Sequence, residues 1–359
     1  MNIRDLARPE ILSLQPYSSA RSESAMAEVM LNANEAPWPP AGVPKAMQGR
    51  ALNRYPDPQP ADLLARLAEL YSVDESRILV GRGSDEAIDL LVRCFCRPGV
   101  DAVAIMPPTF GMYAVCASVQ GAARIEIPLD RNFHVDVDLL LKKLPGSVKL
   151  VFLCSPNNPT GTLTSHAVIE RIAGSLVDRA LVIVDEAYIE FAESPSVSVL
   201  LGRYENLGIL RTLSKAWGLA GARVGCLLAD VEVISLLRRI MPPYPLPTPS
   251  INAALGALHA DGLATTRQRI GLIISERERM AAALVRLPSV IEVLPSKANF
   301  LCVRFVDAAQ VQRSLQRSGI IVRDVGRHAR LAGFLRISIG SREENSQLLE
   351  ALVRLEVSG

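Results

Sequence analysis

Lys215 is the residue of this sequence with the clearest chemical potential. It follows an apolar run that ends near Arg211, within the segment Thr212-Leu-Ser214-Lys215. An amine at the end of a strand can form a Schiff base with an aldehyde cofactor. Further along the chain, Arg223 can bind a phosphate through two N–H donors. The alternative is a solvated surface lysine, because single lysines are mostly exposed.

A carboxylate follows a second apolar run. Asp185 comes directly after residues 181–184, Leu-Val-Ile-Val, and Tyr188 follows three residues later. Burying a lone carboxylate is costly, so Asp185 needs a partner. A structural salt bridge is one interpretation of this residue. The functional interpretation is an acid that holds the ring nitrogen of a cofactor protonated.

Two more polar segments lie where strands are expected to end. Residues 155–161, Ser-Pro-Asn-Asn-Pro-Thr-Gly, form either a plain turn or a loop whose Asn158 reaches a ligand beside the sheet. Residues 81–86, Gly-Arg-Gly-Ser-Asp-Glu, form either a plain strand-to-helix turn or a phosphate site of backbone N–H groups. Glu86 stands in place of the third glycine of the dinucleotide fingerprint, which disfavours a nucleotide-dependent oxidoreductase.

The elements that must position these motifs alternate along residues 77–240. Strand-length apolar runs are expected at 78–80, 102–106, 124–128, 149–154, 181–185, 208–211 and 226–229. Amphipathic helices are expected at 85–96, 108–119, 165–176 and 231–240. This alternation predicts an α/β fold, a mostly parallel sheet flanked by helices. The four motifs then follow strand ends, where the ligand sites of such sheets gather.

The remainder of the chain predicts a smaller α+β domain. A proline-rich connection, 241–249, precedes a long connecting helix at about 250–287, and strands are expected at 291–294, 298–305, 320–324 and 335–339. We therefore expect an N-terminal arm of residues 1–40 that packs with the small domain, a large cofactor-binding domain of 41–250 and a small domain of 251–359.

Bulk composition excludes several classes of protein. The 359 residues are 49% hydrophobic and 21% charged, and the formal net charge is +2, too near neutral to favour a nucleic-acid or membrane partner. No apolar run reaches the ~20 residues of a membrane helix, and the first residues lack the pattern of a signal peptide, so a cytoplasmic location is expected. The six cysteines are expected to be buried thiols, and the four scattered histidines predict no metal site.

The ordered motifs resemble those of fold-type I pyridoxal-phosphate aminotransferases. Outside them, four segments resemble more closely the histidinol-phosphate aminotransferase family: residues 31–37 (Leu-Asn-Ala-Asn-Glu-Ala-Pro), 53–56 (Asn-Arg-Tyr-Pro), 107–113 (Pro-Pro-Thr-Phe-Gly-Met-Tyr) and 335–340 (Leu-Arg-Ile-Ser-Ile-Gly). The resemblance runs from about residue 17 to 340 and implies a large domain with a central, mostly parallel sheet plus a smaller α+β domain.

The resemblance implies a role for each matching residue. Lys215 would carry the cofactor and move the proton of the reaction, Asp185 would pair with the ring nitrogen, and Tyr188 would bond the ring hydroxyl. The full set implied for pyridoxal 5'-phosphate is Tyr55 from the other subunit, Ser84, Asp85, Phe110, Asn158, Asp185, Tyr188, Ser214, Lys215 and Arg223. Phe110 stands where the family often has tyrosine, so the stacked ring lacks a hydroxyl.

The implied substrate contacts are fewer. Arg336 would grip a carboxylate, and Asn34 and Tyr17 would contact the substrate from the arm. Arg21, with Tyr17, is a candidate for the imidazole ring or the substrate phosphate. No residue set for these two groups follows from the sequence.

The resemblance implies transamination between L-histidinol phosphate and 2-oxoglutarate, giving imidazole acetol phosphate and glutamate in histidine biosynthesis. An aromatic amino-acid aminotransferase and a phosphothreonine decarboxylase on the same architecture remain alternatives, because a shared fold does not decide function. A non-enzymatic cofactor-binding protein is disfavoured by the presence of Lys215, Asp185 and Arg336 together. A homodimer with shared active sites is implied by the role of Tyr55 in the family.

Overall fold

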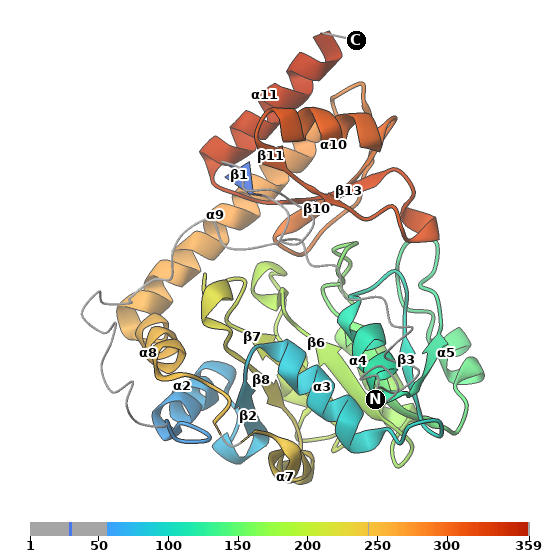
Figure 1. Ribbon diagram of the computed structural model, residues 1–359, viewed down its shortest axis with the longest axis vertical. Helices are drawn as coiled ribbons and strands as arrows, with labels where there is room; N and C mark the ends of the chain where they lie inside the picture. The colour runs from blue at the N-terminus through green and yellow to red at the C-terminus, as the bar shows by residue number, and fades with distance from the viewer. Residues whose placement is uncertain (1–28, 31–55, 243, 358–359) are drawn as a thin grey trace, which may run out of the picture.

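The computed structural model describes residues 29–30, 56–242 and 244–357 of the chain. Two sheets dominate the described part (Figure 1). A seven-stranded sheet with its flanking helices forms the lower part of the view, and a four-stranded sheet with α10 and α11 forms the upper part. The long helix α9 runs from the lower part to the upper one. The two parts meet at the edge where the candidate site lies.

The larger sheet is parallel with one exception. Its strands stand in the order β2 (Ile78–Gly81), β8 (Gly225–Leu228), β7 (Leu207–Thr212), β6 (Leu181–Asp185), β5 (Val148–Cys154), β3 (Ala102–Ile105) and β4 (Ala123–Glu126). β8 runs antiparallel to both of its neighbours, and all other neighbouring pairs are parallel. Every strand expected in residues 78–229 is present, so the predicted α/β sheet is confirmed.

Helices bury both faces of this sheet. Alternate strand residues enter two different cores, as Val182 and Val184 enter one and Ile183 the other. The first core is closed by α2 (Ala61–Tyr71), α5 (Val137–Lys143), α6 (His166–Ser175) and α8 (Thr248–Ala257). The second is closed by α3 (Ser84–Phe95), α4 (Met112–Gln120) and α7 (Val231–Ile240). Burial on both faces explains why these strands are apolar throughout rather than alternating.

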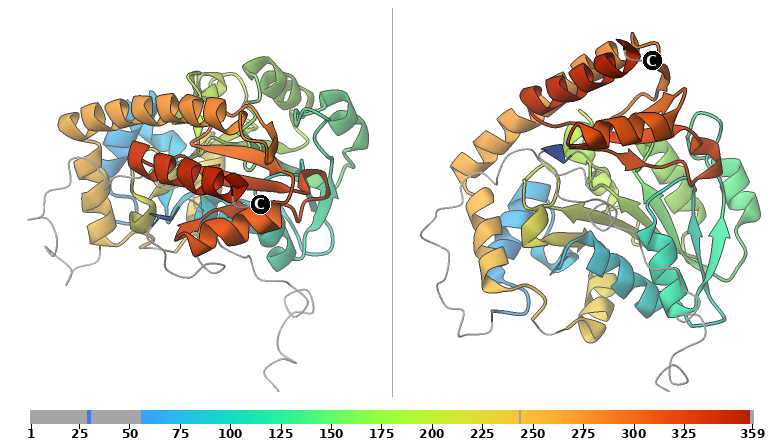
Figure 2. Two further views of the ribbon diagram at one scale, coloured as in Figure 1. Left: turned by 90° about the horizontal axis from the view of Figure 1, so that it is seen from above. Right: turned by 45° about the horizontal axis from the view of Figure 1, so that its top comes forward.

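The smaller sheet is antiparallel and has helices on it. Its order is β12 (Arg323–Asp324), β13 (Phe334–Ser338), β10 (Phe300–Phe305) and β9 (Val290–Val293). α10 (Ala308–Arg317) packs on α11 (Arg342–Val357), which also packs on α9 (Ala260–Leu284), as Figure 2 shows from two directions. Separately, β1 (Val29–Met30) pairs in parallel with β11 (Ile320–Ile321), so a short piece of the N-terminal region joins this half of the molecule.

Three expected elements differ in the structure. The single helix expected at about 250–287 is two helices, α8 and α9, because His259 adopts extended backbone between them. Gly262 allows the tight corner, since a Cβ there would lie 2.4 Å from the carbonyl oxygen of Ala257. The strand expected at 320–324 is divided between β11 and β12, which pair with different strands. The helix expected from residue 108 begins at Met112 instead.

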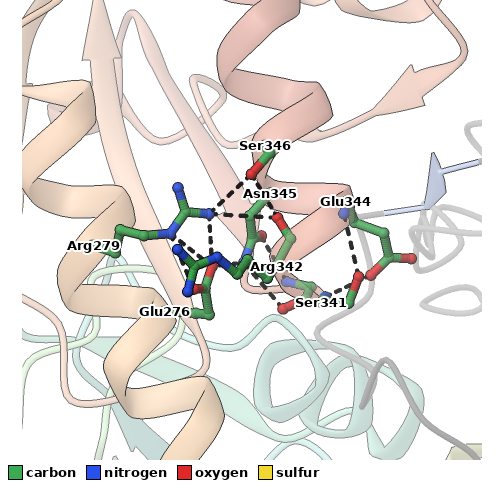
Figure 3. A network of polar contacts seen from close by, with 8 residues as sticks. Glu276, Arg279, Ser341, Arg342, Glu344, Asn345 and Ser346 are labelled. Atoms are coloured by element: carbon green, nitrogen blue, oxygen red, sulfur yellow. Dashed lines mark hydrogen bonds and ion pairs between the residues drawn. The ribbon is translucent and has the colours of Figure 1, made fainter.

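Polar contacts tie the start of α11 to α9 (Figure 3). Ser341 and Glu344 form a capping box, because the Ser341 Oγ accepts from the Glu344 backbone N–H at 3.2 Å and the Glu344 carboxylate accepts from the Ser341 backbone N–H at 2.7 Å. The fully buried Asn345 donates to Glu276 at 3.0 Å and accepts from the backbone N–H of Gly340 at 3.0 Å. These bonds hold the residues that follow β13 in a fixed place.

Other expectations concern cysteines, metals and membranes. All six cysteines are free, and all but the half-buried Cys94 are buried, as expected. Within the residues that the structure describes, no cluster of three or more His, Cys, Asp or Glu could hold a metal ion. The same part of the chain has no helix with the length and apolarity needed to span a bilayer. The domain boundaries at residues 40 and 250 stay predictions.

Candidate functional site

The candidate site forms where three neighbouring strands end. β5, β6 and β7 are parallel and adjacent, so the segments that follow them meet at one edge of the sheet. Asp185 is the last residue of β6, and Asn158 and Lys215 lie in the segments after β5 and β7; the sequence singled out all three. The fourth motif, Ser84, lies at the start of α3, after β2. The fold thus gathers all four motifs at the place expected for ligands of α/β sheets.

Asp185 is the most deeply buried acid of the site. Only 2% of it is exposed, and its carboxylate accepts hydrogen bonds from the Tyr113 hydroxyl at 2.7 Å and from the Ala187 backbone N–H at 3.1 Å. Burial raises the pKa of Asp185 from 3.8 to about 6, and these two hydrogen bonds oppose the rise. Such a carboxylate is well suited to a cationic partner, which would restore its ionised form.

Tyr113 lies in one of the segments that resemble the family, residues 107–113, but the resemblance implies no role for it. Its side chain is fully buried and stacks on Phe152 with a centroid distance of 4.7 Å and an interplanar angle of 5°. Phe110, from the same segment, meets the Tyr113 ring edge-on at 5.6 Å. No local signal identifies the partner of the Tyr113 hydroxyl, because Asp185 is distant in sequence.

Asn158 links the two sheets through its side chain. Its amide nitrogen donates to the Tyr188 hydroxyl at 3.3 Å, and its amide oxygen accepts from Arg336 Nη1 at 2.6 Å. Arg336 lies on β13 of the smaller sheet. Phe300 supports both partners, since it meets the Tyr188 ring edge-on at 5.2 Å and lies 5.4 Å from the Arg336 guanidinium. Lys215 Nζ lies 5.8 Å from the Tyr188 ring centroid.

A cradle for an anion forms at the first turn of α3. The first N–H groups of a helix have no intrahelical acceptor and attract a phosphate. Arg223 lies beside this turn, and its guanidinium donates to Ser214 Oγ at 3.2 Å and to Asp85 at 3.1 Å. Gly83, with φ of +77°, lies so close that a Cβ there would be 2.6 Å from Arg223 Nη2. Gly225 is equally confined, because its Cβ would be 2.6 Å from the Ser84 nitrogen.

The neighbouring acids in this turn have different tasks. Glu86 accepts hydrogen bonds from the backbone N–H of Arg82 at 2.7 Å and from its guanidinium at 2.6 Å, so it closes the turn itself. Asp85 pairs with Arg223 through its carboxylate, at a half-exposed position. An anion in the cradle would therefore meet the backbone of Asp85 and not its side chain, because two negative groups repel each other.

The donor set fits pyridoxal 5'-phosphate group by group. The cradle of α3, Ser214 and Arg223 suits the phosphate, and the buried Asp185 suits a ring nitrogen. Asn158 and Tyr188 suit a ring oxygen, and Lys215 supplies an amine for the aldehyde. Phe110 stands beside Tyr113 at the same edge.

A pocket beside these groups is rich in cationic side chains. Its lining includes Phe110, Asn158, Arg323, His328 and Arg336. The exposed fractions of Arg323 and Arg336 are only 7% and 8%, and burial lowers the pKa of His328. Two guanidinium groups at one pocket indicate a binding site for an anion. Sequence reasoning missed Arg323 and His328, and the only local signal was a basic residue inside an apolar strand.

Four residues with expected roles lie outside the described part of the chain. They are Tyr17, Arg21, Asn34 and Tyr55. Their roles stay predictions.

Comparisons with known proteins agree with the chemistry of this site. The sequence model of the family Aminotransferase class I and II matches residues 16–352. The chain is 49% identical to histidinol-phosphate aminotransferase from Xanthomonas axonopodis pv. citri, over 99% of this chain and 98% of that protein. It is also 49% identical to histidinol-phosphate aminotransferase from Stenotrophomonas maltophilia, over 97% of this chain and 95% of that protein.

Solved structures show the same likeness. Histidinol-phosphate aminotransferase from Sinorhizobium meliloti, in complex with pyridoxal-5'-phosphate, is 25% identical and superimposes with a TM-score of 0.86, covering 98% of this chain and 97% of that one. Aspartate aminotransferase from Thermus thermophilus with maleate shares the fold, with a TM-score of 0.83 at 21% identity, covering 97% of this chain and 99% of that one.

Proposed function

The chain belongs to the Aminotransferase class I and II family, and on this premise we propose that it transfers the amino group of L-histidinol phosphate to 2-oxoglutarate. The products are imidazole acetol phosphate and glutamate, and the reaction serves histidine biosynthesis. The protein is a pyridoxal-phosphate-dependent transaminase of fold type I. The observation that supports histidinol phosphate as the substrate is the 49% identity, over nearly the whole chain, to relatives named histidinol-phosphate aminotransferase.

The residues of the site divide the chemistry among them. Pyridoxal phosphate, when bound, supplies an aldehyde that joins amines and a ring that accepts the electron pair left when the substrate Cα loses its proton. Lys215 is the amine that holds the cofactor and the base that moves that proton. Asp185, ionised and buried, keeps the ring nitrogen protonated. Arg223 and the first turn of α3 hold the phosphate and so fix the orientation of the ring.

Both proposed substrates bring an anion to the pocket beside Asn158. 2-Oxoglutarate carries a carboxylate on its reacting carbon, and histidinol phosphate carries a phosphate one methylene and one oxygen further away. We assign Arg336 to both anions, because its guanidinium already donates to Asn158 in the site. We assign Arg323 to the larger and more highly charged phosphate, because it is buried in the same pocket. This pair is proposed in addition to Arg21 and Tyr17, the candidates from the sequence, which lie outside the described residues.

Side-by-side assays test the proposed reaction. Amino transfer to 2-oxoglutarate is measured with histidinol phosphate, phenylalanine and tyrosine as donors, and carbon dioxide release is measured with phosphothreonine. We expect the highest kcat/KM for histidinol phosphate. A higher kcat/KM for phenylalanine would assign the chain to aromatic amino-acid transamination, and carbon dioxide release would assign it to phosphothreonine decarboxylation.

The attachment of the cofactor to Lys215 is tested separately from the choice of substrate. Borohydride reduction of the cofactor-loaded protein followed by peptide mapping should place the label on Lys215. Lys215→Ala should abolish transamination and labelling, whereas Lys142→Ala, at an exposed position in the last turn of α5, should leave both unchanged. Labelling of another lysine would overturn the assignment.

The assembly and the location of the protein are further parts of the proposal. A homodimer in which Tyr55 completes the neighbouring site is supported by the family resemblance, and a cytoplasmic location by the absence of long apolar runs in the sequence. Light scattering tests the first statement and cell fractionation the second.

A further inference from the structure

Tyr113 carries a hydrogen bond that the proposed chemistry leaves unused. Its hydroxyl lies 2.7 Å from Asp185 Oδ2, and both side chains are buried. Within the described part of the chain, the Asp185 carboxylate also accepts a hydrogen bond from the backbone N–H of Ala187 at 3.1 Å. Tyr113 is therefore a side chain that donates directly to Asp185, the acid proposed to pair with the cofactor ring.

The Tyr113 ring is held so that its hydroxyl has little freedom. It lies parallel to Phe152 of β5 at 4.7 Å, and Phe110 closes its edge at 5.6 Å. The segment that carries it is anchored to the next strand end, because Thr109 Oγ1 donates to Asn157 at 2.9 Å and Asn157 donates back to the carbonyl of Pro108 at 2.9 Å. A donor fixed in advance loses little entropy when it binds the acid.

The hydroxyl favours the charged form of the acid. Burial disfavours an ionised carboxylate, and a hydrogen bond from an O–H donor to that carboxylate opposes the effect. In a dry site, the proton shared by a carboxylate and a ring nitrogen sits on the nitrogen only if the carboxylate is well stabilised. Without the donor, the state with a neutral acid and a neutral ring becomes more stable relative to the ion pair. A neutral ring withdraws electrons less strongly than a protonated one.

We propose that Tyr113 is a positioning residue that orients the Asp185 carboxylate and keeps it ionised, so that the cofactor ring stays protonated during transamination. The same segment would then act on the ring in two ways. Phe110 would lie against the face of the ring, and Tyr113 would donate to the acid that pairs with the ring nitrogen. This inference rests on the cofactor of the proposed function and is independent of the substrate.

The test is Tyr113→Phe, which removes one oxygen and keeps the ring that packs on Phe152. In the cofactor-loaded protein without substrate, the pH midpoint of the visible absorbance change should rise by about one unit, because a neutral ring leaves the imine nitrogen on Lys215 more basic. kcat should fall by about tenfold, and KM should change by less than about threefold, since no substrate contact is removed. Tyr71→Phe is the control, because it removes another buried hydroxyl, from α2, and should leave the midpoint unchanged.

A second set of variants separates positioning from general packing. In an Asp185→Asn background, Tyr113→Phe should no longer move the absorbance midpoint, because the acid through which it acts is gone. Phe152→Leu keeps the hydroxyl but loosens the ring, and should shift the midpoint in the same direction by a smaller amount. An unchanged midpoint in Tyr113→Phe, or an equal shift in the Asp185→Asn background, would overturn the inference. Because the absorbance is read without substrate, a wrong amino donor in the proposed function would leave this test intact.

Discussion

At the scale of single residues, Asp185 shows how burial prepares a carboxylate to bind a cation. A carboxylate that is 2% exposed has lost most of its hydration, and two hydrogen bonds only partly replace it. The pKa of about 6 means that the acid gives up its proton with difficulty in the cofactor-free protein. A protonated ring nitrogen removes that difficulty, so the burial of Asp185 favours a cationic ligand over a neutral one.

This burial predicts a pH-dependent stability difference between the cofactor-free protein and its Asp185→Asn variant. The folded protein has the higher pKa, about 6 against 3.8, so the stability due to Asp185 is complete below about pH 4 and is lost as the pH rises through 6. At pH 7 the variant should therefore be more stable than the wild type by on the order of 3 kcal/mol, and the difference should nearly vanish at pH 4.

Denaturant unfolding between pH 4 and 8 measures this difference. Asp62→Asn, at an exposed position in the first turn of α2, reports the effect of removing a surface carboxylate. A variant that is less stable than the wild type at pH 7 would contradict the prediction.

The two buried arginines of the pocket, Arg323 and Arg336, predict that one substitution can raise the KM for one substrate and leave the KM for the other nearly unchanged. Arg323→Gln should raise the KM for histidinol phosphate by about 10- to 100-fold, the range for a lost hydrogen bond to a charged group. The KM for 2-oxoglutarate should change by less than about threefold, since its carboxylate is assigned to Arg336. Steady-state kinetics with each substrate varied in turn gives both values, and Arg317→Gln on the exposed end of α10 is the control. An equal rise for both substrates would remove Arg323 from phosphate recognition.

At the scale of elements, the turn between β2 and α3 is shaped by what lies against it. Gly83 has a positive φ, and the Arg223 guanidinium fills the space where a side chain would begin. On the other side, Gly225 of β8 lets the antiparallel strand approach the same turn. Gly83 and Gly225 thus allow an arginine and a strand to pack closely against the turn that would hold the anion.

A matched pair of glycine substitutions tests this account. Gly83 and Gly99 have similar φ values of +77° and +71°, but a Cβ at Gly99 would meet nothing within 4 Å. Replacement of Gly99 by alanine should cost about 1 kcal/mol of unfolding free energy through backbone strain, and replacement of Gly83 should cost more, because its ψ of 174° lies in a region that is essentially restricted to glycine. Only Gly83→Ala should also displace Arg223 and weaken binding of pyridoxal phosphate, by about tenfold or more. Fluorescence titration of the cofactor-free variants measures the affinity, and equal affinities in the two would contradict the role of the turn.

At the scale of the whole molecule, the site depends on contacts between the two sheets. Arg336 of β13 reaches Asn158, and the buried Arg277 of α9 donates to the carbonyl of Phe191 in the larger part and to that of Ala298 in the smaller part. Gly161 meets Ser296 so closely that a Cβ would lie 2.3 Å from its hydroxyl. The pocket proposed for the substrate lies at this junction, so the smaller sheet supplies part of the candidate site and not only a cover for it.

The proposed dimer predicts recovery of activity when two inactive variants are mixed. Lys215→Ala and Tyr55→Ala act in the same active site but would come from different subunits. After unfolding and refolding together, heterodimers would contain one intact site, and the mixture should regain about one quarter of wild-type activity.

A mixture of Lys215→Ala with Asp185→Asn is the control for this experiment. Both residues belong to the same subunit of each site, so no intact site can form and no activity should return. Failure of the first mixture to recover, in a protein shown to be a dimer, would place Tyr55 in its own subunit's site.

Local patterns in the sequence were enough to predict much of the larger sheet. Apolar strand-length runs between amphipathic helices need only the preference of each segment, and burial on both faces makes those runs conspicuous. The motifs around Asn158, Asp185 and Lys215 could be placed beside one another because parallel strands end at the same edge. The smaller part was predicted less well, since the break at His259 and the division of residues 320–324 depend on neighbours distant in the chain.

The sequence by itself determined the order of the elements, the cofactor chemistry centred on Lys215 and the family resemblance. Only the tertiary structure decided that Tyr113 donates to Asp185, that Arg323 lies beside Arg336, and that Glu86 closes the phosphate turn. The physical reason is that a residue's propensity and polarity are local properties, whereas burial and hydrogen-bond partners arise when segments far apart in the chain pack together.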